Sequence, residues 1–193
     1  MEQNTTLMGL VRQTFELPEQ DIRTYSPLTL AYIGDAIYDL IIRTMLVEKG
    51  NSQVNKLHQR ASAMVKAVAQ KEIMLVIEPL LTEEERGYYK RGRNAKSYTT
   101  AKNASIGEYR VATGFEALLG FLYLTDRMER LMELVKLGVE RLQELPASAM
   151  NHAKLGTKAK AGKLQTHPQA KAEAKKDTDV MEAETTAESC TAP

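Results

Sequence analysis

The sequence predicts an all-α fold, and three observations support this prediction. Apolar residues recur at three- and four-residue steps through most of residues 1–146, which is the period of helices with one buried face. Residues that start and stop helices separate these stretches. No alternating apolar and polar run is bounded by hairpin dipeptides, so the signals for strands are weak.

The first of two strongly apolar helices is predicted to end at Gly50, because glycine often follows the last turn of a helix. The first has an apolar stripe made of Leu30, Ile33, Ile37, Leu40 and Ile41. Asn51 and Ser52 are of the types that cap helices, so they predict the start of a second helix. Its stripe contains Val54, Leu57, Ala61, Met64, Val65 and Val68.

Capping residues mark the later helices. Thr82 followed by Glu85 at the third position matches a capping box, in which the two residues bond each other's backbone N–H groups. Pro79 just before it is expected to end the preceding helix. Two further apolar-periodic stretches, residues 107–124 and 126–145, complete the predicted helices.

Composition divides the chain of 193 residues into three parts. Residues 147–193 lack aromatic side chains and cannot bury enough apolar surface to offset the entropy of ordering. We therefore expect a disordered charged tail there, an N-terminal segment over residues 1–21, and one helical domain over residues 22–146. The net charge is only +1, and the tail mixes both signs, so any site for a polyanion must be a local patch.

Cysteine usage and hydropathy limit the class of protein further. The single cysteine, Cys190, excludes a disulfide framework. No apolar stretch approaches the ~20 residues of a membrane-spanning helix. The N-terminus also lacks the basic and apolar regions of a signal peptide. We expect a soluble, cytoplasmic protein with no membrane partner.

Two carboxylates lie inside strongly apolar stretches: Asp35 in LAYIGDAIYDL and Glu116 in TGFEALLGFLYL. Because burying an unpaired charge is costly, each acid either faces water at a helix edge or holds something positive. Two acids brought together repel unless a proton or a cation lies between them. With no Cys or His nearby in the sequence, an all-oxygen site favours Mg²⁺, or Mn²⁺, over zinc.

Asp39 lies four residues after Asp35, so the two side chains share one side of a helix. Asp39 could be a third metal ligand or could orient water on the metal. The simpler explanation is a solvated acid paired with Arg43 at the next four-residue step. Gly34 and Gly120 lie within the two acidic helices, and this predicts that another backbone or a substrate approaches them closely.

A basic stretch lies between the capping box and the helix of Glu116. Residues 86–110, RGYYKRGRNAKSYTTAKNASIGEYR, contain seven basic residues against one acid, and we expect much of this stretch to be an exposed loop. Arg, Lys and neutral donors of this kind suit phosphate oxygens. The alternative is a solvated surface loop. The candidate residues for binding a polyanion are Lys90, Arg91, Arg93, Asn94, Lys96, Ser97, Lys102 and Asn103.

Taken together, these segments resemble the ribonuclease III family. LAYIGDAIYDL resembles its signature, a Leu-Glu-Phe-Leu-Gly-Asp-type run, and GFEALLGFLYL resembles its second acidic helix, Ala-Phe-Glu-Ala-Leu-Ile-Gly. The stretch YKRGRNAKSYTTAKNAS looks closest to Mini-ribonuclease III, the short bacterial branch. The resemblance covers about residues 22–145, the predicted catalytic domain, and Asp35 and Glu116 match the family's catalytic, metal-binding acids.

The resemblance implies a homodimer of helical domains that cleaves double-stranded RNA with Mg²⁺. Products would carry 5′-phosphate and 3′-hydroxyl ends, and helix residues such as Leu30, Ile33 and Ile37 would contribute to the dimer interface. The implied substrate is the precursor of large-subunit (23S) ribosomal RNA, with a ribosomal protein as a possible assistant. Such recognition uses the shape and phosphates of the duplex.

The sequence departs from the full-length family at two acidic positions. Ala31 stands where the first motif carries a Glu, and Thr113 stands where the second carries an Asp. The short branch is similar in having this reduced set. The double-stranded-RNA-binding domain of the full-length enzyme is not expected in the tail. The rival hypotheses are a catalytically silent RNA-binding or ribosome-associated domain, and a module that binds an acidic protein partner.

Overall fold

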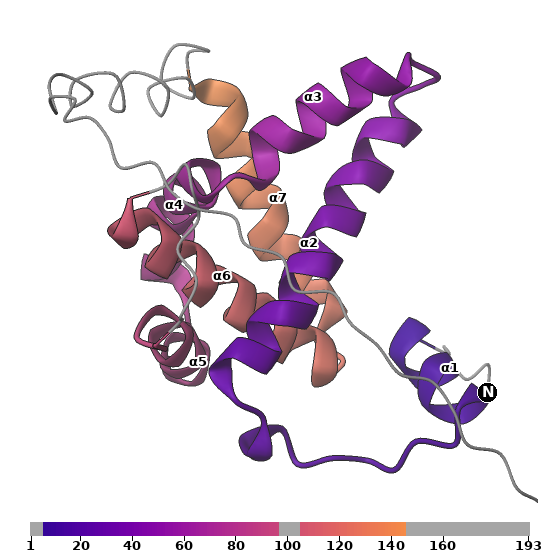
Figure 1. Ribbon diagram of the computed structural model, residues 1–193, viewed down its shortest axis with the longest axis vertical. Helices are drawn as coiled ribbons and strands as arrows, with labels where there is room; N and C mark the ends of the chain where they lie inside the picture. Colours follow the sequence, from indigo (N-terminus) through magenta and orange to yellow (C-terminus); the bar gives the residue numbers. More distant parts are fainter. Residues whose placement is uncertain (1–5, 97–104, 146–193) are drawn as a thin grey trace, which may run out of the picture. The chain divides into compact units, whose positions relative to one another are not determined.

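A computed structural model of the chain describes residues 6–96 and 105–145 (Figure 1). No strand occurs in these two ranges, which confirms the predicted all-α class. The predicted tail at 147–193 lies outside them, so its disorder stays a prediction. The helices are α1 (Leu7–Thr14), α2 (Pro27–Glu48), α3 (Val54–Val65), α4 (Ala67–Ile77), α5 (Glu83–Arg93), α6 (Ile106–Leu124) and α7 (Met128–Glu144), with 3-10 turns η1 (Ile22–Thr24) and η2 (Glu78–Leu80).

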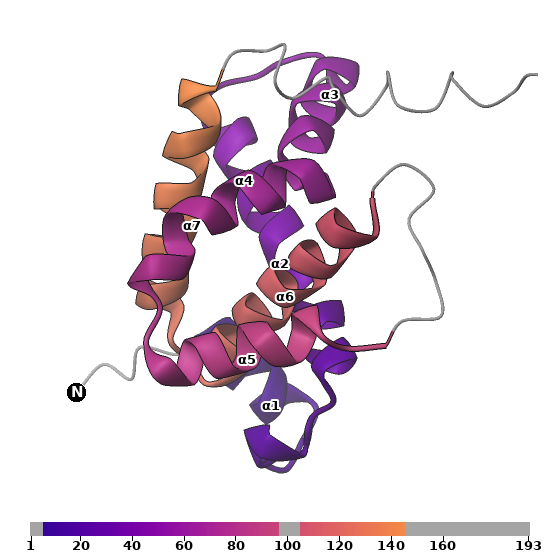
Figure 2. The same ribbon diagram turned by 90° about the vertical axis from the view of Figure 1, so that its left-hand side faces the viewer.

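Helix α6 is the central element of the domain. It packs against α2, α4, α5 and α7, and its apolar residues face neighbours on nearly all sides (Figures 1 and 2). A helix that is apolar all round is expected to be buried in this way. Its buried residues are Ala112, Thr113, Gly114, Phe115, Ala117, Leu118, Leu119, Gly120, Phe121, Leu122 and Tyr123.

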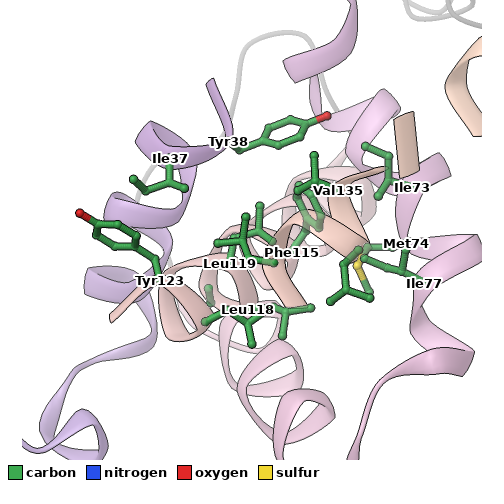
Figure 3. Packing of buried hydrophobic residues seen from close by; sticks show 14 of the residues in the cluster. Ile37, Tyr38, Ile73, Met74, Ile77, Phe115, Leu118, Leu119, Tyr123 and Val135 are labelled. Atoms are coloured by element: carbon green, nitrogen blue, oxygen red, sulfur yellow. The ribbon is translucent and has the colours of Figure 1, made fainter. Parts of the chain in front are cut away.

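The core forms where α6 meets α2, α4 and α7 (Figure 3). Tyr38 and Phe115 are both fully buried and meet edge to face, with ring centroids 5.1 Å apart. Tyr38 also donates its hydroxyl hydrogen to the Met64 carbonyl at 3.1 Å, so the buried phenol has a partner. The ring contact fixes α2 against α6, the two helices that carry the predicted acids, and the hydrogen bond joins α2 to α3.

Capping residues begin the helices as the sequence indicates. Thr82 and Glu85 form the predicted capping box at the start of α5. A second capping box, Ser105 with Glu108, begins α6 and was not predicted. Each box satisfies backbone N–H groups that the first turn of a helix leaves without partners.

The stripe predicted as one helix from Val54 to Val68 is two helices. Helix α3 ends at Val65, and Lys66 adopts an extended conformation before α4 begins. Asn51 and Ser52 do not cap α3 either, because its N-cap is Gln53 and no side-chain capping bond forms there. The prediction of a single continuous helix was therefore wrong.

No helix in the described residues is both long and apolar enough to span a membrane.

Candidate active site

Helices α2 and α6 cross in backbone contact at two glycines. A Cβ atom added to Gly34 would overlap the Glu116 carbonyl oxygen and lie 2.7 Å from its carbonyl carbon. A Cβ atom added to Gly120 would lie 2.8 Å from the Leu30 carbonyl carbon. The predicted close approach of another backbone is confirmed. Because Asp35 follows Gly34, this crossing brings the helical turns of the two predicted acids together.

Glu116 carries the most strongly perturbed carboxyl group at this crossing. Burial raises its pKa from 4.5 to about 7, the charge of Asp35 also raises it, and a hydrogen bond from Gln70 opposes both effects. In that bond, Gln70 Nε2 donates to Glu116 Oε1 at 3.2 Å. At neutral pH, a proton therefore competes with any cation for this carboxylate.

Asp35 and Asp39 lie one turn apart on α2. Asp35 is exposed to solvent on one side, but the desolvation caused by the surrounding helices still raises its pKa, and the charge of Asp39 raises it further. Arg43 Nε donates to Asp39 Oδ2 at 2.5 Å, so the simpler explanation for Asp39, an ion pair along the helix, is confirmed. A role for Asp39 in orienting water on a metal stays a prediction.

The two acids suit a hard cation that keeps part of its water. Asp35 is close enough to raise the pKa of Glu116, so a cation between them would relieve their repulsion. Mg²⁺ is commonly bound through one or two carboxylates while it retains several waters. Among residues 6–96 and 105–145, no three His, Cys, Asp or Glu side chains form a group that could hold a metal. The two carboxylates are oxygen donors, the type of ligand that hard divalent cations prefer.

The two positions that lack the family's acids are buried. Ala31 is 6% exposed and Thr113 is 5% exposed. The Thr113 hydroxyl donates to the Tyr109 carbonyl at 3.0 Å, within its own helix. Neither position therefore replaces the missing carboxylates.

Helix α5 brings part of the basic stretch close to this crossing. Its residue Gly92 packs on α6, where an added Cβ would lie 2.8 Å from the Thr113 carbonyl oxygen and 2.9 Å from Gly114 Cα. The last turn of α5 therefore lies within one turn of Glu116 along α6. Figure 2 shows α5 beside α6. The candidate RNA-binding residues that the structure describes here are all exposed: Lys90, Arg91, Arg93, Asn94 and Lys96.

The expectation of an exposed loop is wrong for the first part of residues 86–110. Residues up to Arg93 belong to α5, where Tyr88 and Tyr89 are only 8% and 1% exposed. Tyr88 stacks on Phe121 with ring centroids 3.9 Å apart, so neither tyrosine can stack freely on a base.

Arg91 has a structural contact as well as an exposed position. Its Nη2 donates to the Tyr25 carbonyl at 3.0 Å and thereby ties α5 to the segment before α2. Ser97, Lys102 and Asn103 lie outside the described residues, so their part in RNA binding stays a prediction.

Sequence reasoning missed Gln70. It is 1% exposed on α4 and is the neighbour that donates to Glu116. Little in the sequence marks this residue, because Gln70 is followed by Lys71 and Glu72 in AVAQKEIMLVI and so looks like part of a polar, solvent-facing stretch.

Comparisons with known proteins point to one family. A model of the ribonuclease III domain matches residues 28–127. The chain is 49% identical over 130 residues to a Mini-ribonuclease 3 of Clostridium tetani, covering 67% of this chain and 86% of that protein. It is 47% identical over 139 residues to a Mini-ribonuclease 3 of Thermoanaerobacter sp., covering 72% and 98% respectively.

A solved structure shows the same helical fold. A Fusobacterium nucleatum protein, determined by X-ray crystallography, superposes with a TM-score of 0.57 at 33% identity. The match covers 63% of this chain and 97% of that one.

The fold and the domain match together define an endoribonuclease, of a family that acts on double-stranded RNA and generally uses divalent metal ions. The chain belongs to the ribonuclease III family. Within it, the relatives above place the chain with the Mini-ribonuclease 3 proteins.

Proposed function

We propose that this protein cleaves double-stranded RNA with Mg²⁺, for which Mn²⁺ can substitute, and leaves 5′-phosphate and 3′-hydroxyl ends. The observation that supports this proposal is the backbone contact at Gly34, which brings the turn of Asp35 against the turn of Glu116. Burial is the main cause of the raised pKa of both carboxyl groups, and a neighbouring charge adds to it: that of Asp35 at Glu116 and that of Asp39 at Asp35.

In this proposal Asp35 and Glu116 are the catalytic residues and the metal ligands. Bound there, the ion would supply an activated water and stabilise charge on the leaving 3′ oxygen. The exposed cations at the end of α5 would hold the phosphates of the duplex near the two carboxylates. Asp39, which already pairs with Arg43, would orient water beside Asp35.

The proposed biological substrate is the precursor of large-subunit (23S) ribosomal RNA, cut near its ends in the cytoplasm, with a ribosomal protein as a possible assistant. This substrate is proposed from the likeness to Mini-ribonuclease 3 proteins. Cells that lack the protein should accumulate large-subunit RNA with extended ends. Normal ends in such cells would contradict the assignment.

We also propose a homodimer that pairs through α2. The sequence led us to expect Leu30, Ile33 and Ile37 at the interface, but Leu30 and Ile37 are buried within the chain and only Ile33 is partly exposed. The same helix exposes a different apolar stripe, in which Leu28, Tyr32 and Leu40 are 39%, 82% and 51% exposed. Sedimentation should give the mass of two chains for the wild type and one chain for Tyr32→Asp. A wild-type monomer at micromolar concentration would contradict the dimer.

A cleavage assay tests the proposed reaction. Wild-type protein with Mg²⁺ is expected to cut a ribosomal-RNA precursor duplex, while EDTA or Asp35→Asn abolishes cutting, because either removes the ion from the site. Asp126→Asn is the matched control, since Asn tolerates the positive φ of Asp126 at the surface. If the wild type and Asp35→Asn bind the duplex equally and neither cuts, the protein is a silent RNA-binding domain.

The salt dependence of RNA binding tests the cations of α5. Replacing Lys90, Arg93 and Lys96 by Ala should make the plot of log RNA-binding constant against log salt concentration less steep. The slope should change by about 0.9 for each phosphate contact removed. Lys136→Ala, an exposed cation on α7, should leave the slope unchanged. An unchanged slope in the triple variant would mean that these cations only stabilise the end of the helix.

A further inference from the structure

Gln70 occupies a place where an apolar residue is expected. It lies on α4 among Ala69, Ile73 and Met74, which are at most 2% exposed, and is itself 1% exposed. A polar amide is stable in such surroundings only when its donors and acceptor have partners. Its hydrogen bonds therefore show what the residue does.

The amide nitrogen of Gln70 bridges two acceptors. Nε2 donates to Glu116 Oε1 at 3.2 Å and to the Val65 carbonyl at 3.3 Å. Both neighbours accept, so the nitrogen and not the oxygen must face them. Gln70 Oε1 is then left buried without a hydrogen-bond partner among the described residues. An unpaired buried acceptor lowers stability, so packing alone does not account for a Gln at this position.

The second acceptor explains how the amide is held. Val65 is the last residue of α3, and the chain is extended at Lys66 before α4 starts. Gln70 therefore links the carboxylate of Glu116 to the break between α3 and α4. The Gly34 contact fixes the backbone of Glu116, but the side chain keeps its own rotatable bonds, and the bond from Gln70 restrains them.

We propose that Gln70 is a positioning residue that holds Glu116 Oε1 and leaves the second carboxylate oxygen for the ion shared with Asp35. This inference rests on the proposed metal-dependent function. In this inference Gln70, an uncharged residue of α4, orients Glu116, a metal ligand on α6. Groups that orient metal ligands typically change metal affinity about 10- to 100-fold when they are removed.

The test compares Gln70→Met with the wild type in the full chain. Methionine has nearly the length and shape of glutamine, fills the buried space with apolar atoms and removes both N–H donors of the amide. Titration with Mn²⁺ alone, without RNA, should show binding weakened at least about tenfold. Duplex cleavage should need correspondingly more Mg²⁺ for half-maximal rate and recover much of the wild-type rate at saturating Mg²⁺.

A matched control separates positioning from general damage to the fold. Thr125→Val removes a hydroxyl that donates to the Phe121 carbonyl at the far end of α6. It should leave Mn²⁺ binding unchanged. Wild-type Mn²⁺ affinity in folded Gln70→Met would overturn the inference. Absence of Mn²⁺ binding by the wild type would instead overturn the proposed function on which the inference rests.

A second measurement needs no variant. In the wild-type protein, the side-chain NH₂ resonances of Gln70 should exchange slowly with water, since both hydrogens are engaged in a buried site. They should shift when Mg²⁺ is added, because the ion withdraws electron density from Glu116. Rapidly exchanging resonances that do not respond to Mg²⁺ would overturn the inference even if Gln70→Met fails to fold.

Discussion

Glu116→Gln is expected to abolish duplex cleavage while it stabilises the metal-free protein. Loss of a ligand removes several kcal/mol of metal-assisted stabilisation of the transition state, which corresponds to a rate loss on the order of 10³-fold or more. The substituted amide keeps an oxygen that can accept from Gln70 Nε2, so the local hydrogen bond survives. A loss of activity in this variant would therefore come from removing the negative charge of Glu116.

The effect on stability depends on pH with a definite sign. The pKa of Glu116 is about 7 in the fold against an ordinary value of 4.5, so between these values the folded chain holds a proton that the unfolded chain releases. The stabilisation is complete below pH 4.5 and is lost as the pH rises through 7. Carrying the charge in the fold above pH 7 costs up to about 3 kcal/mol.

Denaturant unfolding without metal at pH 5 and pH 8 measures this effect. The wild type should lose stability relative to Glu116→Gln as the pH rises, and Mg²⁺ should restore stability to the wild type only. Equal stability of the two proteins at pH 8 would mean that Glu116 is well hydrated, and the proposed ion would lose its main driving force.

Gly34→Ala is expected to disrupt the crossing of α2 and α6. The added methyl would overlap backbone atoms of Glu116 and lie 2.8 Å from the backbone nitrogen of Gly120, and backbone in a packed helix cannot move aside alone. Overpacking typically costs about 1–3 kcal/mol, and Ala recovers only about 1 kcal/mol through helix propensity. Separating the helices also displaces Asp35 from Glu116, and a shift of about 1 Å can reduce catalysis about 10²-fold.

Gly87→Ala is the matched control for this prediction. Gly87 also lies inside a helix, but an added Cβ there meets nothing within 4 Å. The substitution should therefore stabilise the protein by roughly 0.5–1 kcal/mol and leave cleavage intact. If urea unfolding gives Gly34→Ala the same stability as Gly87→Ala, the two helices are not in the tight contact described.

The sequence revealed helices α2, α6 and α7 and both candidate acids because each produces a local contrast. Asp35 and Glu116 are charges in apolar runs, and Thr82 with Glu85 forms a cap whose partners lie three residues apart. Gly34 was also informative, since a glycine inside a helix has a cost that a close neighbour explains. These signals depend on short spacings, which a single sequence displays.

Features set by distant contacts were not predictable in this way. The break at Lys66 interrupts an apolar stripe with no Gly or Pro to mark it. Much of residues 86–110 was interpreted as a loop because Gly, Asn, Ser and Thr punctuate this stretch, but Gly92 serves close packing against α6 and Tyr89 is buried there. The role of Gln70 could be recognised only from the structure, because its partner Glu116 lies on another helix, far away in the sequence.

Mn²⁺ binding to four proteins tests most directly whether Asp35 and Glu116 hold one ion together. The proteins are the wild type, Asp35→Asn, Glu116→Gln and the double variant. Each single substitution should abolish the tight Mn²⁺ site. The double variant should bind Mn²⁺ no more weakly than either single variant, because the effects of two substitutions on one shared site do not add. Wild-type affinity in either single variant, or two independent and additive losses, would contradict a shared ion.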